Sequence, residues 1–215
     1  MLNTNAWNRL RYTLWAPGYD LIASSFARCR QRSIELAELK PGQRVLIVGC
    51  GTGLDLERLP PDIECSAVDI TPAMIHRTRR RAARLSRVVD AQVMDAQQLR
   101  FPDSSFDVVF LHLIVAVVPD PVACVLEAQR VLRPGGRILV FDKFADDDRP
   151  VPCWRRLVNP LASFLATDVT RKLGDILSAS HLRIVHTEGA RFGTLFKIFV
   201  LQPPSGESAS RQNAG

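Results

Sequence analysis

The sequence predicts a doubly wound α/β domain built on a seven-stranded, mostly parallel sheet. From about residue 42, short and nearly continuous apolar runs alternate with helical stretches, which is typical of parallel strands covered on both faces by crossover helices. Helix start and stop signals agree with this pattern. Pro-Asp-Pro at 119–121 supplies an N-cap and a first-turn proline, and Leu-Arg-Pro-Gly-Gly at 132–136 ends the same helix. Two closely spaced strands late in the chain leave no room for a crossover helix and predict an antiparallel hairpin at the sheet edge.

The predicted elements follow in chain order. A capping region of about 40 residues begins with aromatic residues beside arginines and continues into a helix from Asp20 to about Leu39. Five strands are expected at 44–48, 64–70, 88–94, 106–113 and 137–141. Helices are expected at about 154–165 and 169–180, and the hairpin strands at 182–186 and 195–201. The late hairpin would reverse the direction of the last strand.

Composition predicts one main domain with additions. A chain of 215 residues that is 47% hydrophobic is long enough for one sizeable core. We expect N-terminal capping or interfacial helices over 1–40, the main domain over 41–202, and a disordered tail over 203–215, which is small, polar and proline-led.

Charge and cysteine usage limit the kind of protein. No run reaches the roughly 18 apolar residues of a spanning helix, and the N-terminus lacks a secretory signal, so a cytoplasmic protein is expected. The five cysteines show no C-x-x-C spacing, which argues against a metal site or a disulfide framework. A net charge of +6 permits an anionic partner such as lipid head groups or nucleic acid.

A glycine turn follows the first predicted strand. Residues 45–53 read VLIVGCGTG, so three glycines leave a ligand free to approach the backbone at the start of a helix. The dinucleotide fingerprint G-x-G-x-x-G would need glycine where Leu54 or Leu56 stands, and a P-loop would need a following lysine. The spacing G-x-G-x-G instead suits a nucleoside-type cofactor without a pyrophosphate.

Two acidic residues close the next two strands. Asp69 lies 20 residues after Gly49, where a carboxylate can accept both ribose hydroxyls in an open sheet of this kind. Asp95 closes the third strand, where it can reach an adenine amino group. Either acid alone could be only a turn former or helix cap, but both are in register with the glycine turn.

Four segments together resemble a known family. VLIVGCGTG, AVDITPAMI, MDAQQLRFPDSSFDVVFLH and RVLRPGGRILVFDKF are similar, in this order, to the motifs of class I S-adenosylmethionine-dependent methyltransferases of the ubiquinone/menaquinone branch. The resemblance implies a Rossmann-like fold and S-adenosyl-L-methionine as cofactor. It assigns the following contacts: Gly49, Cys50, Gly51, Thr52 and Gly53 to the methionine part, Asp69 to the ribose, Ile70 and Met74 to the adenine faces, Asp95 and Ala96 to the adenine edge, and His112 to the space beside the methyl group.

Position 47 departs from the family pattern. Family members usually carry Glu or Asp where this chain has Ile47, and that acid helps to organise the amino-acid end of the cofactor. A well-formed charge-assisted interaction of this kind contributes about 1.5–3 kcal/mol. The backbone turn and Asp69 remain, so weaker binding or a substitute group is expected rather than no binding.

The N-terminal segment suggests the methyl acceptor. RYTLWAPGYD resembles the entry segment of bacterial phospholipid N-methyltransferases, and LHLIVAVVPDP resembles their fourth-strand segment. The leading hypothesis is therefore methylation of an ethanolamine-type phospholipid amine by a protein in peripheral contact with an anionic inner membrane face. A quinone or other lipophilic metabolite is the alternative acceptor, and a non-catalytic S-adenosylmethionine-binding regulator is the alternative class. A simple capping helix would explain the same N-terminal aromatics.

Site residues beyond the cofactor motifs are predicted by position. Catalytic roles are expected for His112 and Tyr19, although a strand-end histidine can also be purely packed. Contact with the acceptor is expected for Tyr12, Trp15, Tyr19 and Lys143.

A run of six arginines between 77 and 87 raises the question of nucleic acid. At helical spacing, Arg77, Arg80, Arg81 and Arg84 fall on one face, which favours a solvated face first, a lipid-head-group patch second and nucleic acid last. The arginine spacing therefore argues against nucleic acid as the partner.

Overall fold

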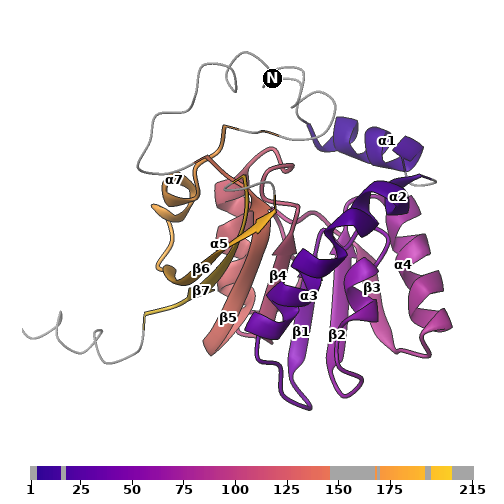
Figure 1. Cartoon of the computed structure of the whole chain (residues 1–215), viewed down its shortest axis with the longest axis horizontal. Helices are drawn as coiled ribbons and strands as arrows, with labels where there is room; N and C mark the ends of the chain where they lie inside the picture. Colours follow the sequence, from indigo (N-terminus) through magenta and orange to yellow (C-terminus); the bar gives the residue numbers. More distant parts are fainter. Residues whose placement is uncertain (1–3, 16–17, 146–167, 169, 192–194, 205–215) are drawn as a thin grey trace, which may run out of the picture.

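The computed structural model describes residues 4–15, 18–145, 168, 170–191 and 195–204, and these form a sheet with helices on both sides (Figure 1). The sheet has seven strands in the order β3-β2-β1-β4-β5-β7-β6. Strands β1 to β5 run parallel, while β7 is antiparallel to both β5 and β6. The predicted fold class, including the late antiparallel hairpin, is confirmed.

The strands lie close to their predicted positions. Their bounds are β1 Arg44–Val48, β2 Glu64–Asp69, β3 Val89–Val93, β4 Phe106–His112, β5 Leu132–Lys143, β6 Arg183–Arg191 and β7 Phe196–Gln202. The helices are α1 Asn5–Trp15, α2 Tyr19–Ala23, α3 Ala27–Leu36, α4 Pro72–Arg84, α5 Pro121–Val131 and α7 Leu173–Leu177, with 3₁₀ turns η1 Ser24–Phe26 and η2 Leu54–Glu57. The single helix expected from Asp20 to Leu39 is thus divided by η1.

Strand β5 begins earlier than predicted. The sequence places a turn at 132–136, but Leu132 pairs with Phe106 of β4, and the pairing resumes at Arg137 with Val108 after a register shift. Gly135 adopts φ +76°, and a Cβ on Gly136 would lie 2.7 Å from the carbonyl oxygen of Asp107. The glycines therefore form an irregularity within the strand. The helix expected at 154–165 and nearly all of the predicted tail lie outside the described residues.

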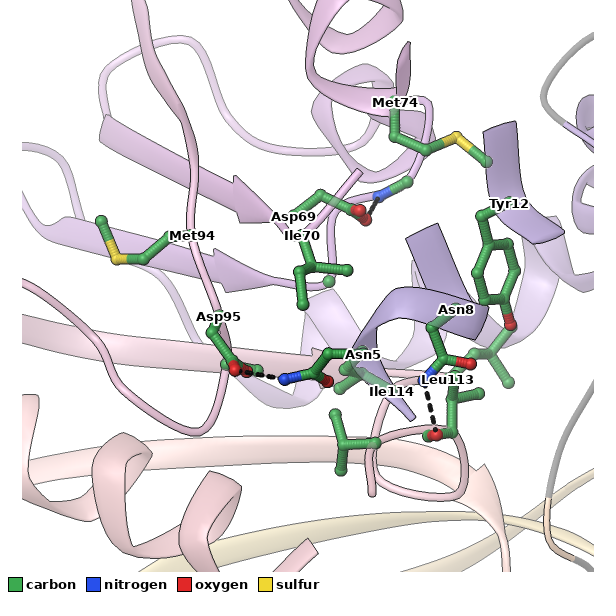
Figure 2. Close-up of a pocket in the computed structure, with 15 residues that line it drawn as sticks. Asn5, Asn8, Tyr12, Asp69, Ile70, Met74, Met94, Asp95, Leu113 and Ile114 are labelled. Carbon is green, nitrogen blue, oxygen red and sulfur yellow. Dashed lines mark hydrogen bonds between the residues drawn. The ribbon is translucent and has the colours of Figure 1, made fainter. Parts of the chain in front are cut away.

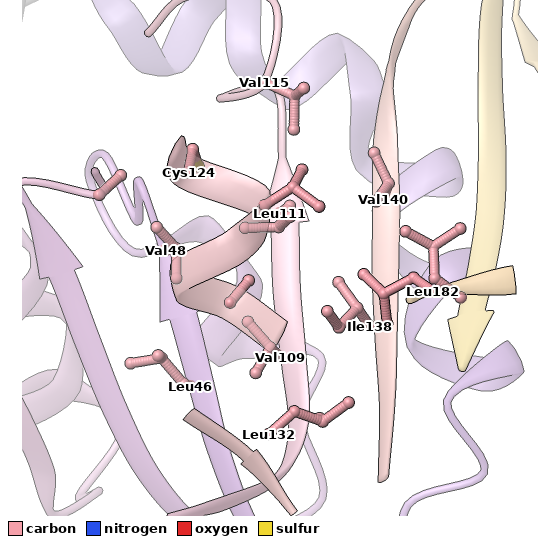
Figure 3. Close-up of a cluster of buried hydrophobic side chains, with 14 of the residues drawn as sticks. Leu46, Val48, Val109, Leu111, Val115, Cys124, Leu132, Ile138, Val140 and Leu182 are labelled. Carbon is pink, nitrogen blue, oxygen red and sulfur yellow. The ribbon is translucent and has the colours of Figure 1, made fainter. Parts of the chain in front are cut away.

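Two apolar clusters cover the two faces of the sheet. On the face covered by α5 and α7, Leu46, Val48, Val109, Leu111 and Val140 pack together (Figure 3). The alternate residues of the same strands form the other cluster, which includes Val45, Ile47, Val108, Phe110 and Leu139 together with Ile34 of α3. Burial on both faces explains why the sequence of these strands is continuously apolar.

No helix among the described residues is long and apolar enough to cross a membrane.

Candidate functional site

A cavity opens at the carboxyl ends of β1, β2, β3 and β4, beneath α1 (Figure 2). About 590 Å³ of space lies between its atoms, part of it open to solvent. The lining residues are Asn5, Asn8, Tyr12, Gly49, Gly51, Asp69, Ile70, Met74, Met94, Asp95, Ala96, Leu113, Ile114, Val117 and Val118.

The glycine turn forms the floor of the cavity beside β1. Gly49 has φ +69°, and a Cβ at this position would lie 2.7 Å from the side chain of Ile114. Both the backbone conformation and the close approach therefore require glycine. The N–H of Cys50 donates to the carbonyl oxygen of Val68 at 2.9 Å, which ties the turn to β2.

Asp69 lies at the end of β2 and faces the same cavity. Its carboxylate accepts hydrogen bonds from the N–H of Gly51 at 3.0 Å and from the N–H of Thr71 at 2.8 Å. Burial raises the pKa of Asp69, and the two backbone donors oppose that shift. The glycine turn and the acid predicted from the sequence are therefore directly hydrogen-bonded.

Asp95, just beyond β3, is held by the N-terminal helix. Asn5 Nδ2 donates to Asp95 Oδ2 at 2.6 Å, as Figure 2 shows, and the N–H of Gln97 donates to Oδ1 at 2.9 Å. Two carboxylates from neighbouring strand ends, Asp69 and Asp95, thus line one cavity.

Helix α1 forms the roof with its polar face. Asn5, Asn8 and Tyr12 line the cavity, and Asn8 Nδ2 donates to the carbonyl oxygen of Val117 at 3.4 Å. On the outward face Leu10 is 54% exposed and Leu14 69% exposed, beside the exposed Arg9 and Thr13. An ordinary surface helix turns such large apolar side chains toward the core.

The loop after β4 closes the side of the cavity. Leu113 has φ +59°, a left-handed conformation that is uncommon for a residue other than glycine. The N–H of Ala116 donates to Asp142 Oδ2 at 2.9 Å, and the fully buried Asp142 has a raised pKa because of that burial. The end of β5 therefore holds a loop that supplies four lining residues.

His112 lies outside the lining of the cavity. Its Nε2 is 2.9 Å from Ser33 Oγ, and its Nδ1 is 3.0 Å from Asp55 Oδ1. Asp55 also accepts a hydrogen bond from Arg30 Nη1 at 2.7 Å, and all four side chains are buried. In this structure the histidine belongs to a buried polar network on the α3 face of the sheet, so its catalytic role stays a prediction without support from this geometry.

The structure sorts the predicted site residues by place. Those that line the cavity are Tyr12, Gly49, Gly51, Asp69, Ile70, Met74, Asp95 and Ala96. Those outside the lining are Trp15, Cys50, Thr52, Gly53, His112 and Lys143. The side chain of Tyr19 is outside the described part of the structure. The roles of all these residues remain predictions.

Three of the residues outside the lining have partners that explain their positions. Thr52 Oγ1 donates to Asp20 in a short hydrogen bond, and Cys50 Sγ lies 3.5 Å from Thr78 Oγ1. Lys143 packs over the ring of Phe196 at 5.1 Å, and burial lowers its pKa. Thr52 and Cys50 therefore connect the glycine turn to α2 and α4.

Sequence reasoning missed part of the lining. Asn5 and Asn8 stand at i, i+3 spacing and share a face with Tyr12 at i+7, a signal that the sequence itself carries. Leu113 and Ile114 lie in the segment LHLIVAVVPDP, but their placement depends on the loop conformation. Among the described residues, no group of three or more His, Cys, Asp or Glu side chains could hold a metal ion.

Comparison with known proteins gives one consistent result. Residues 46–140 match the family model described as "Methyltransferase domain". Over 142 residues the chain is 34% identical to phosphatidylethanolamine N-methyltransferase of Cereibacter sphaeroides, a match that covers 65% of this chain and 70% of that protein. It is 36% identical over 135 residues to demethylmenaquinone methyltransferase of Thermus thermophilus, covering 59% of this chain and 61% of the relative.

Solved structures share the fold. Geranyl diphosphate C-methyltransferase of Streptomyces coelicolor, solved with S-adenosyl-L-homocysteine, superposes with a TM-score of 0.67 at 13% identity, covering 81% of this chain and 78% of that one.

Proposed function

The chain belongs to the S-adenosylmethionine-dependent methyltransferases, and we propose that it methylates the amine of an ethanolamine-type phospholipid. When bound, S-adenosylmethionine supplies an electrophilic methyl group. The remaining work falls to the residues of this chain, which must bind the cofactor, align the amine and exclude water.

The lining of the cavity fits this cofactor. Gly49 and Gly51 line the cavity, so a ligand could lie against the backbone of the turn, while the side chain of Ile114 packs closely against Gly49. Asp69 is suited to the ribose hydroxyls because an ionised carboxylate accepts two hydrogen bonds. Ile70 and Met74 would contact the adenine faces, and Asp95 its amino group.

A lipid acceptor is supported above all by the exposed leucines of α1. The polar Asn8 and Arg11 are buried against the protein, whereas Leu10 and Leu14 are exposed, beside Arg9 and Thr13, on the helix that covers the cavity. A helix of this kind can lie at a lipid surface while its polar face closes the site below. Such a roof would let a lipid head group reach the cofactor from the bilayer side.

The amine must be neutral when it accepts the methyl group, because a protonated amine has no free lone pair.

We assign contact with the acceptor to two tyrosines. Tyr12 lines the cavity, and Tyr19 is predicted from the sequence. His112 is assigned to positioning, because both of its ring nitrogens already have protein partners.

The alternative acceptor is a quinone-like metabolite, which would use the same outward apolar surface. The match to a demethylmenaquinone methyltransferase supports this alternative at similar identity. A polar amine head group and a planar aromatic acceptor make different demands on the site, so the two can be separated by assay.

The test measures methyl transfer from S-adenosylmethionine to three acceptors: vesicles containing phosphatidylethanolamine, a demethylated quinone in detergent, and free ethanolamine. We expect transfer to the vesicle lipid, accompanied by new methylated ethanolamine lipids in cells that produce the protein. Transfer to the quinone alone would replace our proposal with the alternative.

Calorimetry with S-adenosylmethionine completes the test. Cofactor binding without methyl consumption on any of the three acceptors would identify a non-catalytic regulator. An Asp69→Ala variant serves as the inactive control, since it loses the carboxylate at the ribose position but keeps α1 intact.

A further inference from the structure

Helix α4 carries arginines of two kinds. Arg81 is 7% exposed, and its Nε donates to the carbonyl oxygen of Thr52 at 2.9 Å. Its guanidinium also contacts Asp20 Oδ2 at 2.5 Å and forms a close ion pair with Glu57. The expectation that Arg81 lies on a solvated face is therefore wrong, because its guanidinium is buried in contacts with Asp20, Glu57 and the carbonyl oxygen of Thr52.

The other three arginines of this face remain directed at a groove. Arg77, Arg80 and Arg84 line it together with Asp20, Thr52, Arg81 and Ala83, and about 960 Å³ of space lies between its atoms, part of it open to solvent. Within the part of the chain that the structure describes, these three guanidiniums make no hydrogen bond or ion pair. Since Arg81 already engages Asp20 and Glu57, the groove carries a positive excess.

Exposed apolar side chains accompany this positive charge. Asp20 of α2 is bound to Arg81, and the next residue, Leu21, is 84% exposed. Helix α1, with exposed Leu14, also packs against α4. Figure 1 shows α1 and α2 at the same end of the molecule as α4.

This combination indicates the chemistry of the partner. Phosphates attract arginines in lipids and in nucleic acids alike, but only a bilayer also offers an apolar layer for leucines next to the cations. We propose that the α4 groove, defined by Arg77, Arg80 and Arg84, docks the protein on an anionic phospholipid bilayer.

This inference goes beyond the proposed function, because it concerns the phosphates of the surface and not the group that is methylated. Docking through α4 would bring the bilayer to the end of the sheet where α1 covers the cavity. The arginines would then act in binding and leave the chemistry at the cavity unchanged.

The experiment compares two double variants of equal charge change. Arg80→Gln/Arg84→Gln removes two groove cations. Lys40→Gln/Arg183→Gln removes two exposed cations outside the groove, one four residues before β1 and one at the start of the edge strand β6. Sedimentation with phosphatidylcholine vesicles, with and without phosphatidylglycerol, measures partitioning in the absence of ethanolamine lipid and cofactor.

We expect wild-type protein to bind the phosphatidylglycerol vesicles in a salt-sensitive manner. The groove variant should bind about ten- to thirtyfold less tightly at low salt, as expected for two arginines near an anionic surface, and the control variant should change less than about threefold. Equal losses in both variants, or no loss in the groove variant, would overturn the proposal.

Two further arms separate other sources of phosphate. The first arm adds a short DNA duplex. If the duplex displaces the protein from the vesicles, and if the groove variant binds the duplex more weakly than wild type, the groove is assigned to nucleic acid instead. Inorganic phosphate that releases the protein at constant ionic strength would assign it to a soluble anion. Because neither vesicle contains an ethanolamine head group, failure here is distinct from failure of the acceptor assay.

Discussion

Nδ1 of His112 lies 3.0 Å from Oδ1 of Asp55, and the side chain of each residue is 1% exposed. Arg30 Nη1 lies 2.7 Å from the other carboxylate oxygen, so β4, η2 and α3 meet at one buried carboxylate. Burial alone would raise the pKa of Asp55, but the charge of Arg30 and the contact with His112 hold it well below its usual range. Asp55 follows the last glycine of the turn by two residues, so the network joins the segment after the turn to α3 and β4.

Asp55→Asn should destabilise the fold strongly. The substitution removes the charge that Arg30 faces in a buried site, and breaking a buried pair in this way costs about 3–5 kcal/mol. Urea unfolding measures the change. Asp62→Asn, at an exposed position, is the matched control and should stay within about 0.5 kcal/mol of wild type. Similar unfolding midpoints for the two variants would contradict a structural role for the network.

Cofactor affinity should depend on pH through Asp69. Burial raises the pKa of this carboxyl, so protonation begins at a higher pH than the ordinary value of about 3.9. The ionised form accepts the ribose hydroxyls, and affinity should therefore be full above the raised pKa and fall as pH falls through it. Calorimetry with S-adenosylmethionine between neutral and mildly acidic pH measures this.

Asp69→Asn provides the check on that assignment. It should bind about ten- to a hundredfold more weakly at neutral pH, since a hydrogen bond to a charged group contributes about 1.5–3 kcal/mol, and it should lose the pH dependence in this range. A pH profile that persists unchanged in this variant would assign the titration to another group.

The outward leucines of α1 provide a test of the lipid acceptor that leaves the cofactor site intact. Leu10→Ser/Leu14→Ser should raise the KM for phosphatidylethanolamine in vesicles severalfold, because less apolar surface enters the lipid interface. The Kd for S-adenosylmethionine should stay unchanged, since Asn5, Asn8 and Tyr12 remain. Val88→Ser, at a position that is 96% exposed away from α1, is the control. An unchanged KM in the leucine variant would place the acceptor entrance elsewhere.

Much of the fold follows from local sequence signals. The predicted strand at 44–48 coincides with β1, and the other parallel strands differ mainly at their ends, because apolar runs bounded by turn residues define buried strands well. The early start of β5 was not predictable in this way. Gly135 and Gly136 are turn residues by type, and they lie in the register shift between the pairs Phe106–Leu132 and Val108–Arg137, which depends on where β4 lies.

The candidate site was predictable where it depends on the backbone turn and the strand ends. Gly49, Asp69 and Asp95 lie around one cavity because the carboxyl ends of parallel strands meet at one edge of a sheet. The direction of a side chain at a strand end is harder to predict, as His112 demonstrates. Its ring faces α3 and η2, where Ser33 and Asp55 provide partners that no local pattern indicates.

Ile47 packs in an apolar cluster at the position where related proteins carry an acid. The side chain is 1% exposed and belongs to the cluster of Val45, Leu56 and Phe110 on the α3 face of the sheet. The buried carboxylate of Asp55 follows the same turn, one residue before Leu56. The turn is therefore supported by packing at position 47 and by a charged network beyond the glycines.

Ile47→Glu should consequently weaken both the fold and cofactor binding. The variant places a carboxylate in an apolar cluster, and an uncompensated buried charge costs at least about 3 kcal/mol. Urea unfolding and calorimetry with S-adenosylmethionine measure the two effects, and Ile47→Val, which should cost only about 0.5–1.5 kcal/mol, separates the effect of charge from that of lost volume. Tighter cofactor binding by the glutamate variant would contradict this prediction. It would show that a carboxylate at position 47 can contact the cofactor, as the family pattern implies.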